Sequence, residues 1–171
     1  YIINHAENQY LFIDLSFVEL VESLESELKD VKGFVILTDK ENMPETKLNN
    51  AMCYEDLISE ESDEFSWPEF DENTASSLCY TSGTTGNPKG VLYSHRSTIL
   101  HAWIVSSGNV AKVSSSTCIL PVVPMFHVNA WGIPYAGAMF GAKLVFPGPA
   151  LDGASVYELI DNEKPDLLMG V

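Results

Sequence analysis

Basic side chains are scarce in this chain. Lys and Arg together number nine among 171 residues, Arg96 is the only arginine, and the formal net charge is −15. Proteins that bind nucleic acid usually carry a cationic stripe that follows the phosphate backbone. With so few basic residues no such stripe can form, and we expect no nucleic-acid partner.

Cysteine is also rare, and its pattern excludes some kinds of site. The three cysteines, Cys53, Cys79 and Cys118, are odd in number, widely spaced and set among apolar residues. This pattern favours buried thiols in a reducing compartment over disulfides or a metal cluster. The four histidines lack metal-ligand spacing as well. We expect a cytoplasmic protein.

Long hydrophobic runs are missing too. A membrane-spanning helix needs about 18 consecutive apolar residues, whereas residues 128–146 are interrupted by Pro134, several glycines and Lys143. We therefore expect no transmembrane segment. The chain starts at Tyr1 rather than at a methionine and stops within an apolar run. We interpret it as an internal fragment, so the lack of a secretory leader carries no information.

The composition nevertheless suits a folded domain, because 46% of the residues are hydrophobic. Nine of the 24 acidic residues lie in residues 55–73, which contain no Lys or Arg. Such runs are usually solvated surface, an interpretation we favour over a docking site. Residues 39–73 show no sustained periodicity and contain Pro44 and Pro68. They predict a long acidic connection with one short helix near residues 54–59.

Strands and helices are predicted to alternate along the chain. Residues 10–14 and 34–38 predict strands, and the helix between them is expected to begin with a capping box of Ser16 and Glu19. This is a β-α-β unit with a parallel pair of strands. Further strands are predicted at residues 76–80, 91–95, 117–124, 142–146 and 166–170, with a helix capped by Ser94, a buried helix at 128–140 and a helix at 155–162 capped through Ser155 and Glu158. The fold class is α/β, a layered and mostly parallel sheet with flanking helices.

The stretch "YTSGTTGNPKGV", residues 80–91, predicts an anion-binding loop. A strand that ends in a glycine-rich turn can direct several backbone N–H groups into one concavity. The hydroxyl groups add donors or a Mg²⁺ ligand, and Lys89 adds a positive charge. A Walker A loop would require Gly-Lys-Ser/Thr, whereas Pro88 precedes Lys89 and Gly90 follows it. A flexible surface turn is the alternative interpretation.

This stretch matches the phosphate-loop signature of the adenylate-forming superfamily, which includes acyl-CoA synthetases, aryl-CoA ligases and luciferases. A second stretch, "PMFHVNAWG", resembles the next core motif of that superfamily in the form seen in fatty acyl-CoA synthetases, and "GAKLVFPGP" follows it. The resemblance covers residues 1–171. It implies part of an N-terminal AMP-binding domain, with the C-terminal domain and its catalytic Lys outside the chain, so the fragment alone is expected to be inactive.

The resemblance implies a two-step ligase reaction. A carboxylate attacks the α-phosphate of ATP to form an acyl-adenylate and pyrophosphate, and the thiol of coenzyme A then displaces AMP. ATP, Mg²⁺, coenzyme A and a fatty acid are the implied cofactors and substrates. An aryl-CoA ligase, or another adenylating enzyme, and a catalytically dead nucleotide-binding or scaffold relative remain as alternatives. The resemblance also allows a homodimer and peripheral association with a membrane.

The same resemblance assigns roles to particular residues. It implies that Thr81 lies close to Mg²⁺ and that His127 acts at the carboxylate and the α-phosphate, although a lone His after a strand is structural about as often as functional. Val128 and Trp131 are expected to line an acyl tunnel, with core packing as the alternative. Trp131 follows His127 by four residues, so in a helix both could face one cavity. The residues expected to hold the β- and γ-phosphates are Thr81, Ser82, Gly83, Thr84, Thr85, Gly86 and Lys89.

Overall fold

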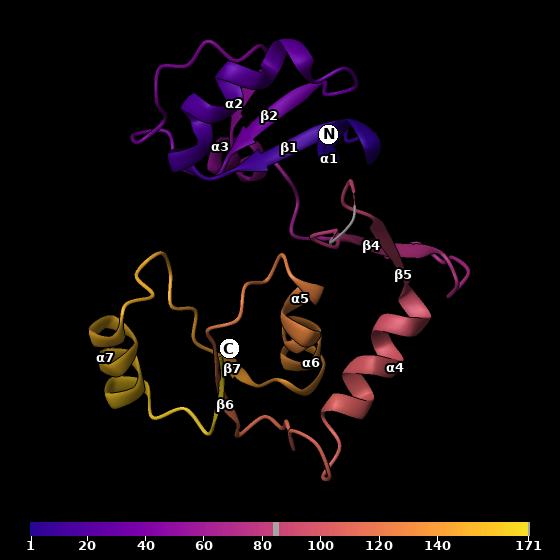
Figure 1. The fold of residues 1–171 in the computed structure, drawn as a ribbon, viewed down its shortest axis with the longest axis vertical. Coiled ribbons are helices and arrows are strands. Elements are labelled where there is room, and N and C mark those ends of the chain that lie inside the picture. Colours follow the sequence, from indigo (N-terminus) through magenta and orange to yellow (C-terminus); the bar gives the residue numbers. More distant parts are fainter. Residues whose placement is uncertain (84–85, 171) are drawn as a thin grey trace. The chain divides into compact units, whose positions relative to one another are not determined.

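The computed structural model describes residues 1–83 and 86–170. The chain folds into two compact units, Tyr1–Pro68 and Glu69–Val171 (Figure 1). No described helix is long and apolar enough to cross a membrane. All three cysteines are free thiols; Cys53 is buried, and Cys79 and Cys118 are half-buried.

The first unit is built on a parallel sheet of order β1-β2-β3. Its strands are β1 (Tyr10–Ile13), β2 (Gly33–Ile36) and β3 (Ala51–Cys53). Phe34 and Ile36 of β2 are almost fully buried, and helix α2 (Val18–Leu24) contributes Val18 and Val21 to the same core. The predicted β-α-β unit is therefore confirmed. The remaining elements of this unit are α1 (Ile2–His5), the 3-10 turns η1 (Leu15–Phe17) and η2 (Glu25–Glu27), and α3 (Tyr54–Ser59).

The start of α2 differs from the prediction. Asp14 is the N-cap of the 3-10 turn η1, which leads into α2: its Oδ1 accepts from the backbone N–H of Ser16 at 2.9 Å and from the Ser16 hydroxyl at 2.7 Å. Ser16 lies inside the 3-10 turn η1, and α2 begins at Val18 with no side-chain cap. An aspartate is at least as good a cap as a serine, and here it stands two residues earlier. The prediction of a capping box formed by Ser16 and Glu19 was therefore wrong.

Residues 39–73 hold more structure than a plain connection. The expected short helix is α3 (Tyr54–Ser59), and it is confirmed. Strand β3 (Ala51–Cys53) was missed, and it pairs in parallel with β2 through three residues. A strand this short shows no alternation of apolar and polar residues, so only its pairing reveals it.

The second unit begins with an antiparallel hairpin, β4 (Ala75–Tyr80) and β5 (Gly90–Ser94), which leads into α4 (His95–Val105). Ser94 caps this helix as predicted, and it forms a capping box with Ser97. A parallel sheet of order β7-β6-β8 follows, and α4 packs against α6. After α4, the elements of this unit are β6 (Cys118–Pro121), α5 (Val128–Trp131), α6 (Ile133–Phe140), β7 (Lys143–Leu144), α7 (Gly153–Glu163) and β8 (Leu167–Met169).

In this unit one helix prediction was wrong. Residues 128–140 are not one helix, because residues 128–132 have positive φ and α6 begins only at Ile133, with Pro134 in its first turn. Proline is tolerated at a helix start, whereas in a helix interior it breaks the hydrogen-bond ladder. The helix predicted at residues 155–162 is confirmed as α7, but its predicted cap was wrong. Helix α7 is capped by Asp152, whose Oδ1 accepts from the N–H groups of Ala154 and Ser155. Ser155 is therefore a partner of the cap and not the cap itself.

Candidate active site

The ends of the glycine-rich loop are held together at a narrow neck. In the hairpin, Tyr80 pairs with Gly90. One residue further on, the Thr81 N–H donates to the Lys89 carbonyl oxygen at 3.0 Å, and the Lys89 N–H lies 3.4 Å from the Thr81 hydroxyl. The neck places the Thr81 hydroxyl and the Lys89 backbone side by side at the mouth of the loop, although the pairing was predicted only as two strands flanking it.

Two glycines of the loop have a positive φ, which glycine adopts more readily than any other residue. Gly83 has a φ of +59°, and a Cβ on it would lie 2.9 Å from the carbonyl oxygen of Gly86. Gly86 has a φ of +131°. L-residues rarely adopt such angles, so glycine is favoured at both positions, and at Gly83 the backbone also leaves no room for a Cβ. Ser82 is exposed and Gly83 is half-buried, while Thr84 and Thr85, also expected to bind phosphate, lie outside the described residues.

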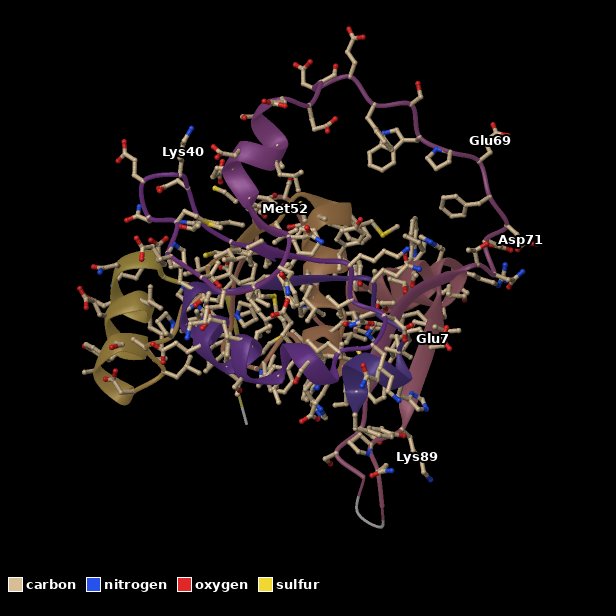
Figure 2. All side chains as sticks on the ribbon, turned by 90° about the horizontal axis from the view of Figure 1, so that it is seen from above. Glu7, Lys40, Met52, Glu69, Asp71 and Lys89 are labelled. Carbon is tan, nitrogen blue, oxygen red and sulfur yellow. The ribbon has the colours of Figure 1, made fainter. Side chains whose placement is uncertain are left out.

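The Lys89 ammonium supplies an uncommitted positive charge. Lys89 is exposed, and Figure 2 shows its side chain reaching outward beside the loop. Within residues 1–83 and 86–170, the ion pairs are Arg96 with Glu72, Lys143 with Glu163, and Lys164 with Asp161, so none uses Lys89. An exposed ammonium beside a glycine-dependent turn is suited to an anionic ligand.

His127 lies after the carboxyl end of β6, where α/β sheets commonly place ligand contacts. Its side chain is exposed, and its backbone N–H donates to the Pro124 carbonyl oxygen at 3.2 Å. His127 has extended backbone angles, with φ of −99° and ψ of 111°. The imidazole is therefore accessible to solvent. His127 is the last residue with an extended backbone before a segment with left-handed backbone angles.

The following segment, Val128–Trp131, is a left-handed turn. The φ angles of Val128, Asn129, Ala130 and Trp131 are 51°, 50°, 47° and 55°, and Gly132 continues the series at 75°. In L-residues such angles cost about 1–2 kcal/mol each. Strain of this kind persists only where neighbouring structure enforces it, and it is concentrated at functional sites. The right-handed helical spacing expected to align His127 with Trp131 is therefore wrong.

Trp131 is not part of the core of this unit, because 51% of its surface is exposed. Its carbonyl oxygen accepts a hydrogen bond of 2.9 Å from Nε2 of His101, on α4. The ring of His101 also covers Gly132, where an added Cβ would lie 2.5 Å from the His101 Cδ2. Sequence reasoning found no role for His101, and no local pattern marks it, since the contact joins residues thirty positions apart.

A cavity of about 270 Å³ lies beside this turn. Of the two residues expected to contact an acyl chain, Val128 lines the cavity and Trp131 does not. The walls come from β5, α4, the left-handed turn and α6. The lining residues are Tyr93, Ser97, Thr98, His101, Val128, Asn129, Gly132 and Tyr135.

Asn129 is the second residue that sequence reasoning missed. Its Oδ1 accepts from the Cys79 thiol at 3.0 Å, and its Nδ2 donates to the Ser77 hydroxyl at 3.2 Å. Ser77 and Cys79 are two residues apart on β4, so their side chains share one face of the strand. That spacing, together with the place of Asn129 inside the "FHVNAWG" stretch, was the only available signal.

The geometry combines a glycine-rich loop between two paired strands with a small cavity whose lining includes Tyr93 of β5, and comparison with known proteins identifies the class of protein. The chain belongs to the AMP-binding enzyme family, whose model matches residues 1–171. The family resemblance drawn from the two motifs is thereby confirmed.

Its relatives include several CoA ligases. The chain is 52% identical over 171 residues to a medium-chain-fatty-acid–CoA ligase of Ectopseudomonas oleovorans, covering all of this chain and 31% of that protein. It is 50% identical to a 3-methylmercaptopropionyl-CoA ligase of Ruegeria lacuscaerulensis, covering all of this chain and 32% of the relative. It is 46% identical to a long-chain-fatty-acid–CoA ligase of Thermus thermophilus, covering all of this chain and 30% of the relative. The chain thus spans about 31% of the length of such relatives.

Solved structures show the same fold. The anthranilate CoA ligase AuaEII in complex with anthranoyl-AMP matches with a TM-score of 0.78 at 24% identity, over 98% of this chain and 32% of that chain. A red-emitting luciferase from Phrixothrix hirtus matches with a TM-score of 0.79 at 23% identity, over 95% of this chain and 31% of that chain. The predicted α/β fold class is confirmed.

Proposed function

We propose that the full-length protein containing this chain is an ATP-dependent fatty acid–CoA ligase. It activates a carboxylate as an acyl-adenylate and then transfers the acyl group to coenzyme A. The observation that carries this proposal is the neck between Thr81 and Lys89, closed on a turn in which Gly83 has a left-handed backbone. The relatives named as fatty acid–CoA ligases supply the reaction class.

We assign the loop to the triphosphate. Thr81, Ser82, Gly83 and Gly86 would offer hydroxyl and amide donors to the β- and γ-phosphates, and Lys89 its ammonium. Thr84 and Thr85, in the same loop, are proposed to contribute in the same way. In the first step a carboxylate oxygen forms a bond to the α-phosphorus and the bond to the pyrophosphate oxygen breaks, so these donors stabilise the leaving group.

The Thr81 hydroxyl fits a supporting role toward Mg²⁺. No cluster of three or more His, Cys, Asp or Glu side chains within the described part of the chain could hold a metal ion. Mg²⁺ is commonly bound by few protein ligands together with substrate phosphates, and it prefers oxygen donors. Thr81 would supply one such oxygen, and the ion would offset negative charge on the phosphates.

We propose that His127 hydrogen-bonds the reacting carboxylate or the α-phosphate. Its exposed side chain and its place between β6 and the left-handed turn support this role. Two anions must approach each other in the first step, so a donor that orients the carboxylate lowers the cost of the encounter. The chain's own contribution is therefore positioning and charge stabilisation, and the substrate carboxylate is the nucleophile.

The acyl chain is proposed to extend past Val128 and Trp131 toward the cavity beside the left-handed turn. Val128 lines that cavity, and Trp131 precedes Gly132, which also lines it. Each buried methylene contributes about 0.8 kcal/mol, so an apolar channel can select chain length without polar contacts. Named relatives acting on medium-chain, long-chain and sulfur-containing acids support an aliphatic substrate.

The remaining proposals concern the place of the chain in the protein. We infer that residues 1–171 are part of the N-terminal AMP-binding domain, because the relatives are about three times as long. The free thiols of Cys53, Cys79 and Cys118 support a reducing compartment and hence a cytoplasmic enzyme. Light scattering on the full-length protein would test whether it forms a homodimer.

Acid-dependent exchange of pyrophosphate into ATP tests the function directly. The full-length protein is supplied with ATP, Mg²⁺ and a panel of aliphatic acids of increasing length, together with benzoate-type acids. We expect exchange that is strongest with an aliphatic acid and coenzyme A thioester formation with the same acid. A preference for an aryl acid would show that the enzyme is an aryl-CoA ligase and not a fatty acid–CoA ligase. No exchange with any acid would support a catalytically dead relative.

A further inference from the structure

The left-handed turn needs an anchor, and one side chain supplies it. Within the described residues 128–132, the Asn129 carboxamide is the only side-chain group that hydrogen-bonds to another element. The carboxamide oxygen Oδ1 accepts a hydrogen bond from the Cys79 thiol, and the nitrogen Nδ2 donates one to the Ser77 hydroxyl. A carboxamide satisfied at both ends fixes its own orientation and that of its backbone.

The anchor lies on the strand that carries the phosphate loop. Ser77 and Cys79 belong to β4, and Thr81, at the neck of the loop, is only two residues beyond Cys79. Asn129 itself is two residues after His127 and two before Trp131. The carboxamide therefore links the strand that leads into the loop directly to the turn that follows His127.

The other end of the turn is held independently. The His101 Nε2 donates to the Trp131 carbonyl oxygen at 2.9 Å, so α4 fixes the exit of the turn while β4 fixes its middle. Between these two contacts the backbone keeps angles that non-glycine residues avoid. Removing the Asn129 contacts should let the middle of the turn relax while its exit stays held.

We propose that Asn129 is a positioning residue that locks the Val128–Trp131 turn to β4 and thereby sets the place of His127 relative to the phosphate loop. This inference rests on the proposed function for its kinetic consequences. Asn129 does not itself contact the reacting atoms, so it acts through His127 and the turn.

The first test replaces Asn129 by leucine, which has a similar size and can form neither hydrogen bond. In the full-length enzyme we expect Asn129→Leu to lower kcat for adenylate formation by about tenfold to a hundredfold, the range that small misplacement of a reacting group produces. The KM for ATP should stay within about twofold, because the hydrogen bonds at the neck of the loop remain. A kcat that falls only in proportion to the lost folded protein, measured by circular dichroism, would reduce Asn129 to a structural residue.

Substitutions of the partner thiol sharpen the test. Cys79→Ser keeps a donor for the Asn129 Oδ1, whereas Cys79→Ala removes it. We expect Cys79→Ser to keep kcat near the wild-type value and Cys79→Ala to lower it in the same direction as Asn129→Leu. Cys118→Ala, a half-buried cysteine on β6, is the matched control. Equal kcat values for the serine and alanine variants at Cys79 would overturn the proposal.

Amide hydrogen exchange tests whether Asn129 holds the turn, and it does not depend on enzyme activity. The Ala130 N–H donates to the His127 carbonyl at 3.1 Å, and the Gly132 N–H to the Asn129 carbonyl at 2.9 Å. In Asn129→Leu these amides should exchange faster in a peptide covering residues 127–132, with no change in Cys118→Ala. Unchanged exchange would contradict the anchor. If the wild-type protein activates no acid, the proposed function fails, and this measurement still decides whether Asn129 holds the turn.

Discussion

The carbonyl oxygen of Trp131 accepts a hydrogen bond of 2.9 Å from Nε2 of His101. The acceptor is a carbonyl, so Nε2 must carry the proton, which defines the tautomer if the imidazole is neutral. The contact brings the His101 ring so close to Gly132 that no Cβ fits between them. The His101 ring of α4 therefore packs directly on Gly132, and this close contact favours glycine at position 132.

Gly132→Ala should destabilise the protein more than Gly141→Ala. The two glycines have similar backbone angles, with φ of 75° and 70°, so both substitutions carry the left-handed penalty of about 1–2 kcal/mol. At Gly132 the new Cβ would also lie 2.5 Å from the His101 ring, whereas at Gly141 the nearest atom is 3.7 Å away. Urea unfolding of the full-length variants measures the difference.

A second substitution separates the clash from the backbone strain. In Gly132→Ala with His101→Ala, the ring is gone, and the loss of stability relative to His101→Ala alone should fall to that of Gly141→Ala. An equal cost for Gly132→Ala with and without the ring would show that the backbone angle alone requires glycine there.

Asp152 should make stability depend on pH in a defined direction. Hydrogen bonds from the Ser155 hydroxyl, and then from backbone N–H groups, hold the pKa of its carboxyl below the ordinary value of 3.8. A depressed pKa in the folded state contributes stability above the unfolded pKa, and this contribution is lost as the pH falls through the folded value. We expect Asp152→Asn to lose that contribution.

The measurement is thermal unfolding of wild type and Asp152→Asn between pH 7 and pH 3. The Tm difference should be largest near neutral pH and should shrink as the pH falls below about 3.8. Asp63→Asn, in the exposed acidic stretch, is the control and should show a smaller difference. A Tm difference that stays constant down to pH 3 would mean that the aspartate acts as a cap without regard to its charge.

The sequence predicted the elements whose signals are local. The two strands flanking the loop, the Ser94 cap and the glycines at 83 and 86 were predicted, because turn chemistry and capping depend on neighbours in the chain. The antiparallel pairing of those two strands was not predicted. The two wrong caps failed for a related reason. Asp14 and Asp152 each lie two or three residues before the serine that was predicted as the cap. Aspartate and serine are both preferred N-cap residues, so the sequence pattern does not distinguish between them.

The left-handed turn could not be predicted, because its cause is not local. Val128 and Trp131 have apolar spacing that suits a buried helix, and a run of consecutive non-glycine residues rarely adopts left-handed angles. The turn exists in the presence of contacts from Ser77, Cys79 and His101, which are 30 to 52 residues away. Tertiary contacts of this kind leave no period in the sequence.

Trp131→Ala should change acyl selectivity if Trp131 borders the acyl path. Half of its surface is exposed next to the cavity-lining residue Gly132, so its removal opens space there. Each methylene newly accommodated would raise kcat/KM by about fourfold, the equivalent of 0.8 kcal/mol. The measurement is kcat/KM across a series of aliphatic acids of increasing length.

The control for this series is Trp103→Ala. Trp103 is 62% exposed on α4, and its ring packs edge-on against Phe140 at 6.0 Å between centroids. This variant removes an indole of comparable exposure that, unlike Trp131, is not adjacent in the chain to a cavity-lining residue. A chain-length profile that shifts equally in both variants, or in neither, would remove Trp131 from the acyl path.

Lys89→Ala should weaken adenylation without unfolding the protein. The ammonium has no ion-pair partner among the described residues, so the folded chain loses little when it is removed. A charge-assisted contact to phosphate is worth about 1.5–3 kcal/mol, which corresponds to one to two decades in pyrophosphate exchange. Lys40→Ala, another exposed lysine, in the first unit, is the control and should exchange at the wild-type rate. Because a point charge is the feature at stake, Lys89→Arg should recover part of the lost exchange, whereas Lys89→Met should not. Equal exchange in the alanine, arginine and wild-type proteins would mean that the loop binds its anion through backbone and hydroxyl groups alone.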